Sequence, residues 1–290
     1  MVRAHPFRFT SADGLSISCT RWDGDRTPTG VVQIAHGLGE HMGRYAGLIE
    51  CLVDAGMVVY GNDHRGHGKT AARPEDFGDF GPGGFDLLVE DLHRLSCIAI
   101  GEQPGRPLIL LGHSMGSFAA QKYALDYSDC IHGLALSGSG ALDGLVELVR
   151  SSGRDPGDLL NARFQPARTP CEWLSRDPAA VDGFLNDPLC FGWLKPDAAE
   201  SFFAAATELA DPTRLHDIRR GLPIYLFSGT EDPVGQQLRG PAVLVGRYRE
   251  AGIANIAYDY YSGGRHEMLN ETNRDEVRRN LLRWIAEVIA

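Results

Sequence analysis

The sequence predicts an α/β protein with a mostly parallel central sheet and helices on both faces. Short, uninterrupted apolar runs such as Leu108–Leu111 have the pattern of strands buried on both sides of a parallel sheet. They alternate with stretches whose apolar residues recur at helical spacing, such as Phe118–Tyr127. Because parallel strands are joined by right-handed crossovers, this alternation favours one sheet with a helical layer on each face.

The individual elements follow from local signals. Phe7–Thr10 and Ser16–Trp22, joined by Ala12–Gly14, predict an antiparallel hairpin at one sheet edge. A helix is expected over Tyr45–Ala55, ending before Gly56, and an amphipathic helix is expected at the C-terminus. Further strands are expected at Val31–Ala35, Met57–Tyr60, Leu108–Leu111, Leu134–Ser137, Leu222–Ser228 and Ile253–Tyr261, and further helices within Phe85–Ile100, Ser114–Tyr127 and Pro241–Ala251.

The alternation stops between Ser139 and about Pro212. No clear strand is visible there, and seven of the chain's sixteen prolines fall in this stretch. We therefore expect a core of residues 1–138 and 213–290, with residues 139–212 (the insert) forming a helical cap, or lid. Two interpretations of its aromatic residues both hold in part: they pack the insert's own core, or they line an apolar pocket. They are Trp173, Phe184, Phe191, Trp193, Phe202 and Phe203.

The composition excludes some classes of partner. With 290 residues and a formal net charge of −10, the chain lacks the basic surface that nucleic-acid binding requires. No segment predicts a signal peptide or a membrane span, so stable membrane anchoring is not expected, whereas transient lipid contact through the cap and the oligomeric state stay open. Six scattered cysteines without C-x-x-C pairs favour reduced thiols and a cytoplasmic location.

A G-x-S-x-G pentapeptide, Gly112–Gly116, lies between a predicted strand and a predicted helix. The pentapeptide alone is a weak signal, and the alternative is an ordinary glycine-rich turn. The strand before it and the helix after it are the context in which such a serine is held exposed in a strained turn. The helix N-terminus also directs its N–H groups toward developing negative charge. Ser114 is therefore the predicted nucleophile of an acyl-transfer reaction.

A serine nucleophile needs a base and a carboxylate that orients it. Of the histidines that follow Ser114, His132 and His216 precede strands, whereas His266 follows one and lies at the edge where α/β sheets bind ligands. Asp232, after the strand ending at Ser228, is the predicted acid, with the adjacent Glu231 in reserve and a turn-forming Asp-Pro as the alternative.

Two backbone N–H groups are expected to form the oxyanion hole. One belongs to Met115, which follows the nucleophile, and the other to Leu38 in the loop after an early strand. Four histidines in loops after two strands raise the question of a metal site: His36, His41, His64 and His67. Because such residues more often brace glycine-rich turns, we expect no metal and no cofactor.

Five segments of the chain, taken together, match the motifs of a known enzyme group: His36–Tyr45, Asn62–Gly68, Gly112–Gly116, Asp232-Pro233 and Gly264–Glu271. With them the chain resembles the monoacylglycerol lipase and lysophospholipase group of α/β-hydrolases over nearly its whole length. The resemblance implies the α/β-hydrolase fold, a cap inserted after the strand ending at Ser137, and the site residues named above. Asn186–Leu189 resembles a recurring cap segment of bacterial members. Ser117 stands where many members carry glycine, a difference expected to affect packing only.

These inferences predict a serine hydrolase of carboxylic esters, most simply of single-chain esters resembling monoacylglycerol. Lysophospholipids and short-chain esters are alternatives, followed by peptidase, acyltransferase and carbon–carbon bond hydrolase activities on the same serine. A haloalkane or epoxide hydrolase is disfavoured because residue 114 is serine rather than aspartate. An inactive binding module of the same fold is the non-enzymatic alternative.

Overall fold

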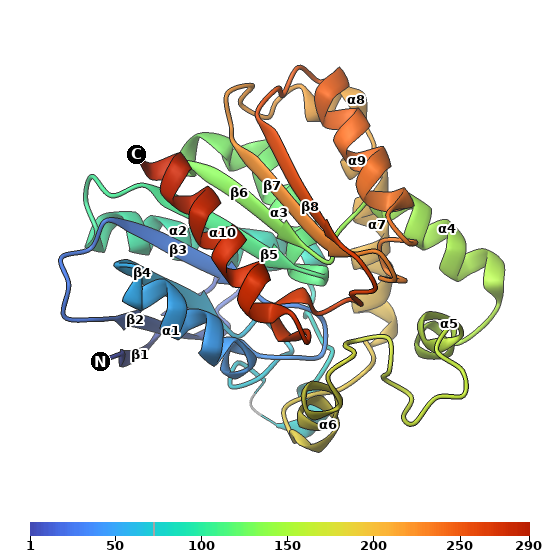
Figure 1. Ribbon diagram of the computed structural model, residues 1–290. Helices are drawn as coiled ribbons and strands as arrows, with labels where there is room; N and C mark the ends of the chain where they lie inside the picture. Colours follow the sequence, from blue (N-terminus) through green and yellow to red (C-terminus); the bar gives the residue numbers. More distant parts are fainter. Residues whose placement is uncertain (72) are drawn as a thin grey trace.

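An eight-stranded sheet forms the centre of the molecule, which a computed structural model describes for residues 1–71 and 73–290 (Figure 1). Its strand order is β1-β2-β4-β3-β5-β6-β7-β8. The β1–β2 and β2–β4 pairs are antiparallel and all other pairs are parallel, which confirms the predicted fold class. The strands are β1 (Arg3–Thr10), β2 (Ser16–Asp23), β3 (Gly30–Ala35), β4 (Met57–Asn62), β5 (Leu108–His113), β6 (Gly133–Ser137), β7 (Ile224–Gly229) and β8 (Ile256–Tyr261).

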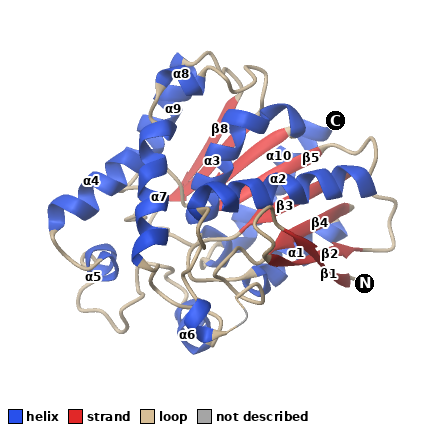
Figure 2. Cartoon of the chain, turned by 180° about the vertical axis from the view of Figure 1, so that it is seen from behind, coloured by secondary structure: helices blue, strands red, loops and turns tan. Residues whose placement is uncertain are grey.

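Helices cover both faces of this sheet. On one face α2 (Gly84–Glu102), α3 (Met115–Tyr127) and α9 (Arg239–Glu250) pack on the sheet, and on the other α1 (Ala46–Asp54) and α10 (Arg274–Ile289) do (Figures 1 and 2). The central strands β3 to β7 are buried at every residue, which explains their continuous apolar runs. Within residues 1–71 and 73–290, four short 3₁₀ helices connect these elements: Met42–Tyr45, Pro74–Asp76, Ser128–Cys130 and Met268–Asn270.

The predicted elements of the core all occur, with small differences at their ends. The helix expected from Tyr45 starts as the 3₁₀ turn Met42–Tyr45 before α1 begins. Helix α3 begins at Met115, so Ser114 is the residue before the helix rather than its first residue. Strand β8 begins at Ile256 rather than Ile253.

The insert is helical and contains no strand among the described residues. It comprises α4 (Leu142–Ser152), α5 (Pro156–Asn161), α6 (Pro178–Asn186) and α7 (Pro196–Leu209), and α8 (Pro212–Leu215) follows before β7. Its prolines have a local role, because each of α5 to α8 begins with proline. In α5, α6 and α8 the preceding aspartate caps the helix by accepting a backbone N–H.

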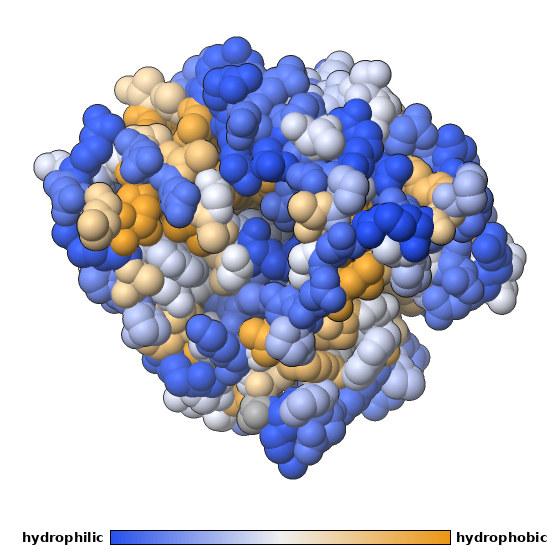
Figure 3. All heavy atoms as spheres, turned by 60° about the horizontal axis from the view of Figure 1, so that its bottom comes forward, coloured by the Kyte–Doolittle hydropathy of each residue, from blue (hydrophilic) through white to orange (hydrophobic). Residues whose placement is uncertain are grey.

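Helix α7 ties the insert to the core. It lies along α4 and also packs on α2 and α3. The Phe202 ring is 5.0 Å from the Phe85 ring and 5.8 Å from the Phe118 ring, so this aromatic belongs to the main core rather than to a pocket. On the face seen in Figure 3, apolar side chains form several separate patches among hydrophilic ones. Across the residues that the structure describes, no helix is both long enough and apolar enough to span a bilayer.

Candidate active site

Ser114 occupies a sharp turn between β5 and α3. Its backbone is left-handed, with φ +52° and ψ −122°, which a residue with a side chain adopts only under strain. The flanking glycines make the turn possible by close packing. A Cβ on Gly112 would lie 2.4 Å from the Gly116 carbonyl oxygen, and one on Gly116 would lie 2.2 Å from the Ala35 carbonyl oxygen. The Ser114 side chain stays partly exposed, whereas the residues on both sides of it are buried.

Ser117 contributes more to this turn than the packing role that we expected. Its hydroxyl donates a hydrogen bond of 2.6 Å to the Ser114 carbonyl oxygen and shares one of 2.8 Å with the Ser139 hydroxyl. Ser139, at the start of the insert, also accepts a hydrogen bond from the Gln121 amide. A glycine at position 117 would lack these contacts, so in this chain the turn is braced from the insert side.

Asp232 and His266 form a buried pair beyond the carboxyl ends of β7 and β8. The His266 Nδ1 atom donates to the Asp232 Oδ1 atom over 2.9 Å, and the same oxygen accepts the Val234 N–H at 2.9 Å. Asp232 is fully buried and His266 is 1% exposed. Burial lowers the pKa of His266, but the nearby carboxylates, Asp232 first and then Glu267 and Glu40, together raise that pKa above its ordinary value. Burial raises the pKa of Asp232, but His266, the Val234 N–H and His113 together hold that pKa below its ordinary value.

The other ring nitrogen of His266 is free. Nε2 is buried and has no hydrogen-bond partner within the described residues, so the Ser114 hydroxyl and His266 are not bonded to each other in the structure. His113 lies close to both residues. Its ring is 4.8 Å from the His266 ring. A Cβ added to Gly37 would lie 3.1 Å from the Ser114 Cβ atom and 3.3 Å from the His113 Cδ2 atom, so Gly37 faces both side chains. Trp173 of the insert also packs on His266, at 5.1 Å between rings. The structure thus brings acid and base together and leaves one nitrogen available.

The loop after β3 presents the other predicted groups. Its turn is held by Glu40, whose Oε1 atom accepts the Gly37 N–H at 2.6 Å and the Tyr45 hydroxyl at 2.6 Å. The next amide, that of Leu38, and the Met115 amide at the start of α3 donate no hydrogen bond to a protein group in the described part of the chain. Two unpaired N–H groups in these positions suit a developing oxyanion.

Sequence reasoning missed the buried ionic network behind this loop. Arg44 donates to Glu40 at 3.2 Å and also to Glu267, the residue after His266, so it connects the loop after β3 to the loop that carries His266. Burial raises the pKa of Glu40, but His113, Arg44 and the Tyr45 hydroxyl together lower it to about 2. The insert contributes Phe184, whose ring lies 5.1 Å from the Arg44 guanidinium.

The reserve and rejected candidates lie elsewhere. Glu231 accepts a hydrogen bond from Arg163 of the insert. His132 accepts the Leu108 N–H, at the amino end of β5, and His216 contacts the Pro212 carbonyl oxygen at the end of α8. Asp259 of β8, another carboxylate on the strand that precedes His266, accepts the Tyr225 hydroxyl. None of these contacts involves His266.

Three of the four loop histidines brace turns. His36 donates through Nδ1 to the Gly37 carbonyl oxygen and accepts the His64 N–H at Nε2, and His67 donates through Nδ1 to the Arg65 carbonyl oxygen. Arg65, which is fully buried, pairs with Asp91 and three further oxygens. The His64 Nδ1 atom contacts the Asn62 side-chain amide at 3.3 Å, whereas the buried Nε2 atoms of His64 and His67 have no partner among the described residues. His41 behaves differently, because its partner is Asp187 of the insert.

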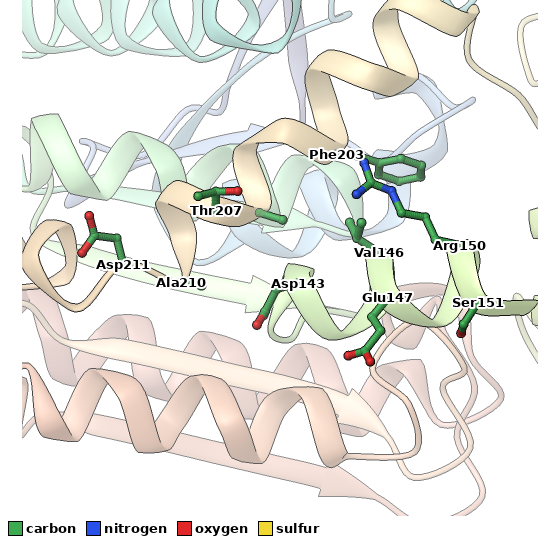
Figure 4. A pocket seen from close by; sticks show the side chains of 10 residues that line it. Asp143, Val146, Glu147, Arg150, Ser151, Phe203, Thr207, Ala210 and Asp211 are labelled. Carbon is green, nitrogen blue, oxygen red and sulfur yellow. The ribbon is translucent and has the colours of Figure 1, made fainter.

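A large open groove of about 850 Å³ lies away from these residues, between α4 and α7. Its floor is apolar, with Val146 and Phe203. Figure 4 shows Arg150 beside Phe203 at one end, Asp211 at the other, and Asp143 between them. Ser114, Asp232 and His266 do not line it. Its size alone does not make it the active site, because it lacks a nucleophile and a base.

Comparison with known proteins gives the family. Residues 26–273 match the family model described as serine aminopeptidase, S33. The chain belongs to this family of α/β-hydrolases. The monoacylglycerol lipase of Mycolicibacterium smegmatis is 29% identical over 280 residues, 96% of this chain and 95% of that one. The monoglyceride lipase of Rattus norvegicus is 31% identical over 239 residues, 77% of this chain and 71% of that one.

A solved structure gives the same result. The thermostable carboxyl esterase from Bacillus coagulans, crystallised in complex with glycerol, superposes with a TM-score of 0.88 and 31% identity, covering 99% of both chains. The chain is thus an α/β-hydrolase of the monoacylglycerol lipase group, and it hydrolyses carboxylic esters. The resemblance predicted from the motifs is confirmed.

Proposed function

We propose that this α/β-hydrolase cleaves esters through an acyl-enzyme intermediate on Ser114. His266 takes the Ser114 proton at Nε2 while Oγ bonds to the ester carbonyl carbon, and Asp232 holds the tautomer that makes this possible. The Leu38 and Met115 amides donate to the oxyanion. His266 then gives its proton to the leaving alcohol as the ester C–O bond breaks. Water repeats the sequence and releases the acid.

One observation carries this proposal: the free Nε2 atom of His266. A buried imidazole whose Nδ1 atom is bonded to a carboxylate and whose Nε2 atom has no partner is arranged to accept a proton. Ser114, Asp232 and His266 follow β5, β7 and β8, so all three lie at the carboxyl edge of the sheet. Apo structures often lack the final hydrogen bond to the nucleophile, which tightens when substrate binds.

We propose single-chain, uncharged esters resembling monoacylglycerol as substrates, with the insert acting as the cap over them. The insert contacts the loops on both sides of Ser114. The His266 N–H donates to the Trp173 carbonyl oxygen at 3.3 Å, and the Phe191 N–H donates to the Gly39 carbonyl oxygen at 2.9 Å. The names of the relatives, monoacylglycerol lipase and carboxyl esterase, support this class of ester. The six free cysteines support a cytoplasmic setting.

The test is hydrolysis of p-nitrophenyl esters of graded chain length, beside monoacylglycerol and lysophospholipid, with Ser114→Ala as the blank. We expect an optimum at medium or long chains and a loss of roughly 10⁶-fold in the variant. A fluorophosphonate should label the wild-type protein and not the variant. Turnover that survives Ser114→Ala nearly intact would end the serine mechanism, and a sharp preference for acetate would favour a short-chain esterase.

Peptide hydrolysis is the second candidate, because the family model is described by a serine aminopeptidase. The same nucleophile and oxyanion groups serve amides and esters alike. Release of free amine from aminoacyl amides, compared with release of fatty acid from monoacylglycerol, separates the two activities. We expect the ester to be the faster substrate.

A further inference from the structure

A mixed group of side chains joins the insert to the loop after β3. His41, from that loop, hydrogen-bonds through Nε2 to the Asp187 Oδ2 atom at 2.9 Å. Asp187 follows the last residue of α6, and the chain turns there so that the Cys190 N–H donates to the Asp187 carbonyl oxygen at 3.0 Å. In the described residues this is the group whose imidazole, carboxylate and thiol atoms all lie within 4.8 Å of one another.

We propose that His41, Asp187 and Cys190 form a binding site for a zinc-like divalent transition-metal ion, with water as the fourth ligand. Imidazole, carboxylate and thiolate are the three protein ligands of zinc, and bond lengths of about 2.0–2.3 Å place tetrahedral ligand atoms about 3.2–3.8 Å apart. The three groups therefore need to move by only about 1 Å to reach this geometry. Calcium and magnesium are disfavoured because they prefer oxygen ligands alone.

The surroundings suit a cation that keeps one water. The side chains of His41 and Asp187 are 13% and 28% exposed, and Cys190 is also partly exposed. His41 lines a cavity of about 160 Å³, and Leu189, which lies between the two ligands from the insert, lines it too. Nearby, the positive charge of Arg44 is already paired with two carboxylates, those of Glu40 and Glu267. Asp187 thus leaves a negative charge that a cation would neutralise.

Binding changes the protonation of two groups. The Gly43 N–H donates to His41 Nδ1 at 3.2 Å, so without a metal the neutral ring carries its proton on Nε2, where it bonds to Asp187. When the ion binds Nε2, that proton moves to Nδ1 and the long Gly43 contact is given up. The Cys190 thiol loses its proton to solvent and becomes the thiolate ligand, so one proton is released for each ion bound.

The consequence would be a link between insert and core. Two of the ligands come from the turn after α6, and the third lies three residues beyond Leu38, whose amide we assign to the oxyanion hole. The Phe191 N–H already bonds to the Gly39 carbonyl oxygen, so an ion at Cys190 would reinforce this junction. Metal binding itself does not depend on the proposed serine mechanism.

The test is titration of the purified, chelator-treated full chain with Co²⁺, a spectroscopic substitute for Zn²⁺. We expect one equivalent to give tetrahedral d–d bands and a thiolate charge-transfer band, both abolished when Zn²⁺ displaces it. Cys190→Ser should lose the charge-transfer band, and Zn²⁺ should raise the melting temperature of the wild-type chain but not that of this variant.

The matched control is Cys130→Ser. Cys130 and Cys97 lie 4.0 and 3.6 Å from the His93 Nε2 atom, so they are the competing thiols for a soft ion. The band should persist in Cys130→Ser. If Cys190→Ser does not fold, Asp187→Asn should weaken Co²⁺ binding by at least about tenfold. No band in the wild-type chain, or a band that survives Cys190→Ser and disappears in Cys130→Ser, would overturn the proposal.

Discussion

Two His–Asp pairs in this molecule have the same separation and different surroundings. His266 and Asp232 are 2.9 Å apart, and so are His41 and Asp187. The first pair is nearly completely buried within the core, whereas the second joins the core to the insert and is partly exposed. The two pairs also differ at the second ring nitrogen. His266 Nε2 has no partner in the described chain, whereas His41 Nδ1 accepts the Gly43 N–H.

The comparison shows that the distance between imidazole and carboxylate does not determine what a pair can do. A charge in a water-excluded site acts on its neighbour far more strongly than one that water screens. Asp232 is in the first situation and raises the pKa of His266. The second ring nitrogen then determines the chemistry. His266 Nε2 is available to accept a proton, whereas His41 Nδ1 is not while it accepts the Gly43 N–H.

The largest expected effect tests the buried pair directly. Asp232→Asn removes the charge and offers an amide in place of the carboxylate, which no longer fixes the productive tautomer. We expect kcat to fall by about 10⁴-fold, the size seen when a triad aspartate is replaced. Ester turnover measures this loss, and circular dichroism shows whether the variant is folded. A folded variant that loses less than about tenfold would show that Asp232 does not orient the base.

The second prediction concerns the network that holds the loop after β3. In Glu40→Gln the Gly37 N–H and the Arg44 guanidinium lose a buried carboxylate, and the Leu38 amide is no longer fixed. We expect kcat to fall by roughly 10²-fold, comparable to the loss of one oxyanion donor, with a smaller change in KM. Tyr45→Phe is the matched control, since it removes one hydrogen bond from an uncharged donor and leaves the same carboxylate in place. An equal loss in both variants would contradict a specific role for Glu40.

The third prediction is the pH dependence of the buried pair. His266 must be neutral to take the Ser114 proton, so kcat/KM falls as pH decreases through its pKa. Because that pKa is raised, the acid limb should have its midpoint above 6.5. In Asp232→Asn the limb should move to lower pH, since the imidazolium loses its stabilising carboxylate. A limb that stays in place in this variant would assign the titration to another group.

The sequence predicted the parts of the molecule that depend on local signals. The core strands are buried on both faces, so their apolar runs were recognisable, and the turn at Ser114 carries its two glycines beside it. The helix starts of the insert were also readable, because Asp155-Pro156, Asp177-Pro178 and Asp211-Pro212 are N-cap and first-turn signals.

Other features depend on pairing over long distances along the chain. Arg44 and Glu267 are 223 residues apart, and His41 and Asp187 are 146 apart. Each of these residues is of a type that usually lies on the protein surface, and its neighbours in the sequence do not show whether it forms a buried or an exposed ion pair. For the same reason nothing local in the sequence separates His41, which bonds to Asp187 of the insert, from the other loop histidines.

The smallest expected effect tests the exposed pair with the same substitution as the first prediction. Asp187→Asn keeps an oxygen that can accept the His41 N–H and removes only a partly screened charge. Such pairs contribute about 0.2–1 kcal/mol, so in the presence of a chelator we expect kcat/KM to fall by no more than about fivefold. The kcat/KM of Asp187→Asn and that of Asp232→Asn are measured side by side, at one pH and with one ester. The result is the ratio of the two falls in kcat/KM. A ratio near one would contradict the distinction between the two pairs, because it would mean that neither burial nor the free nitrogen separates them.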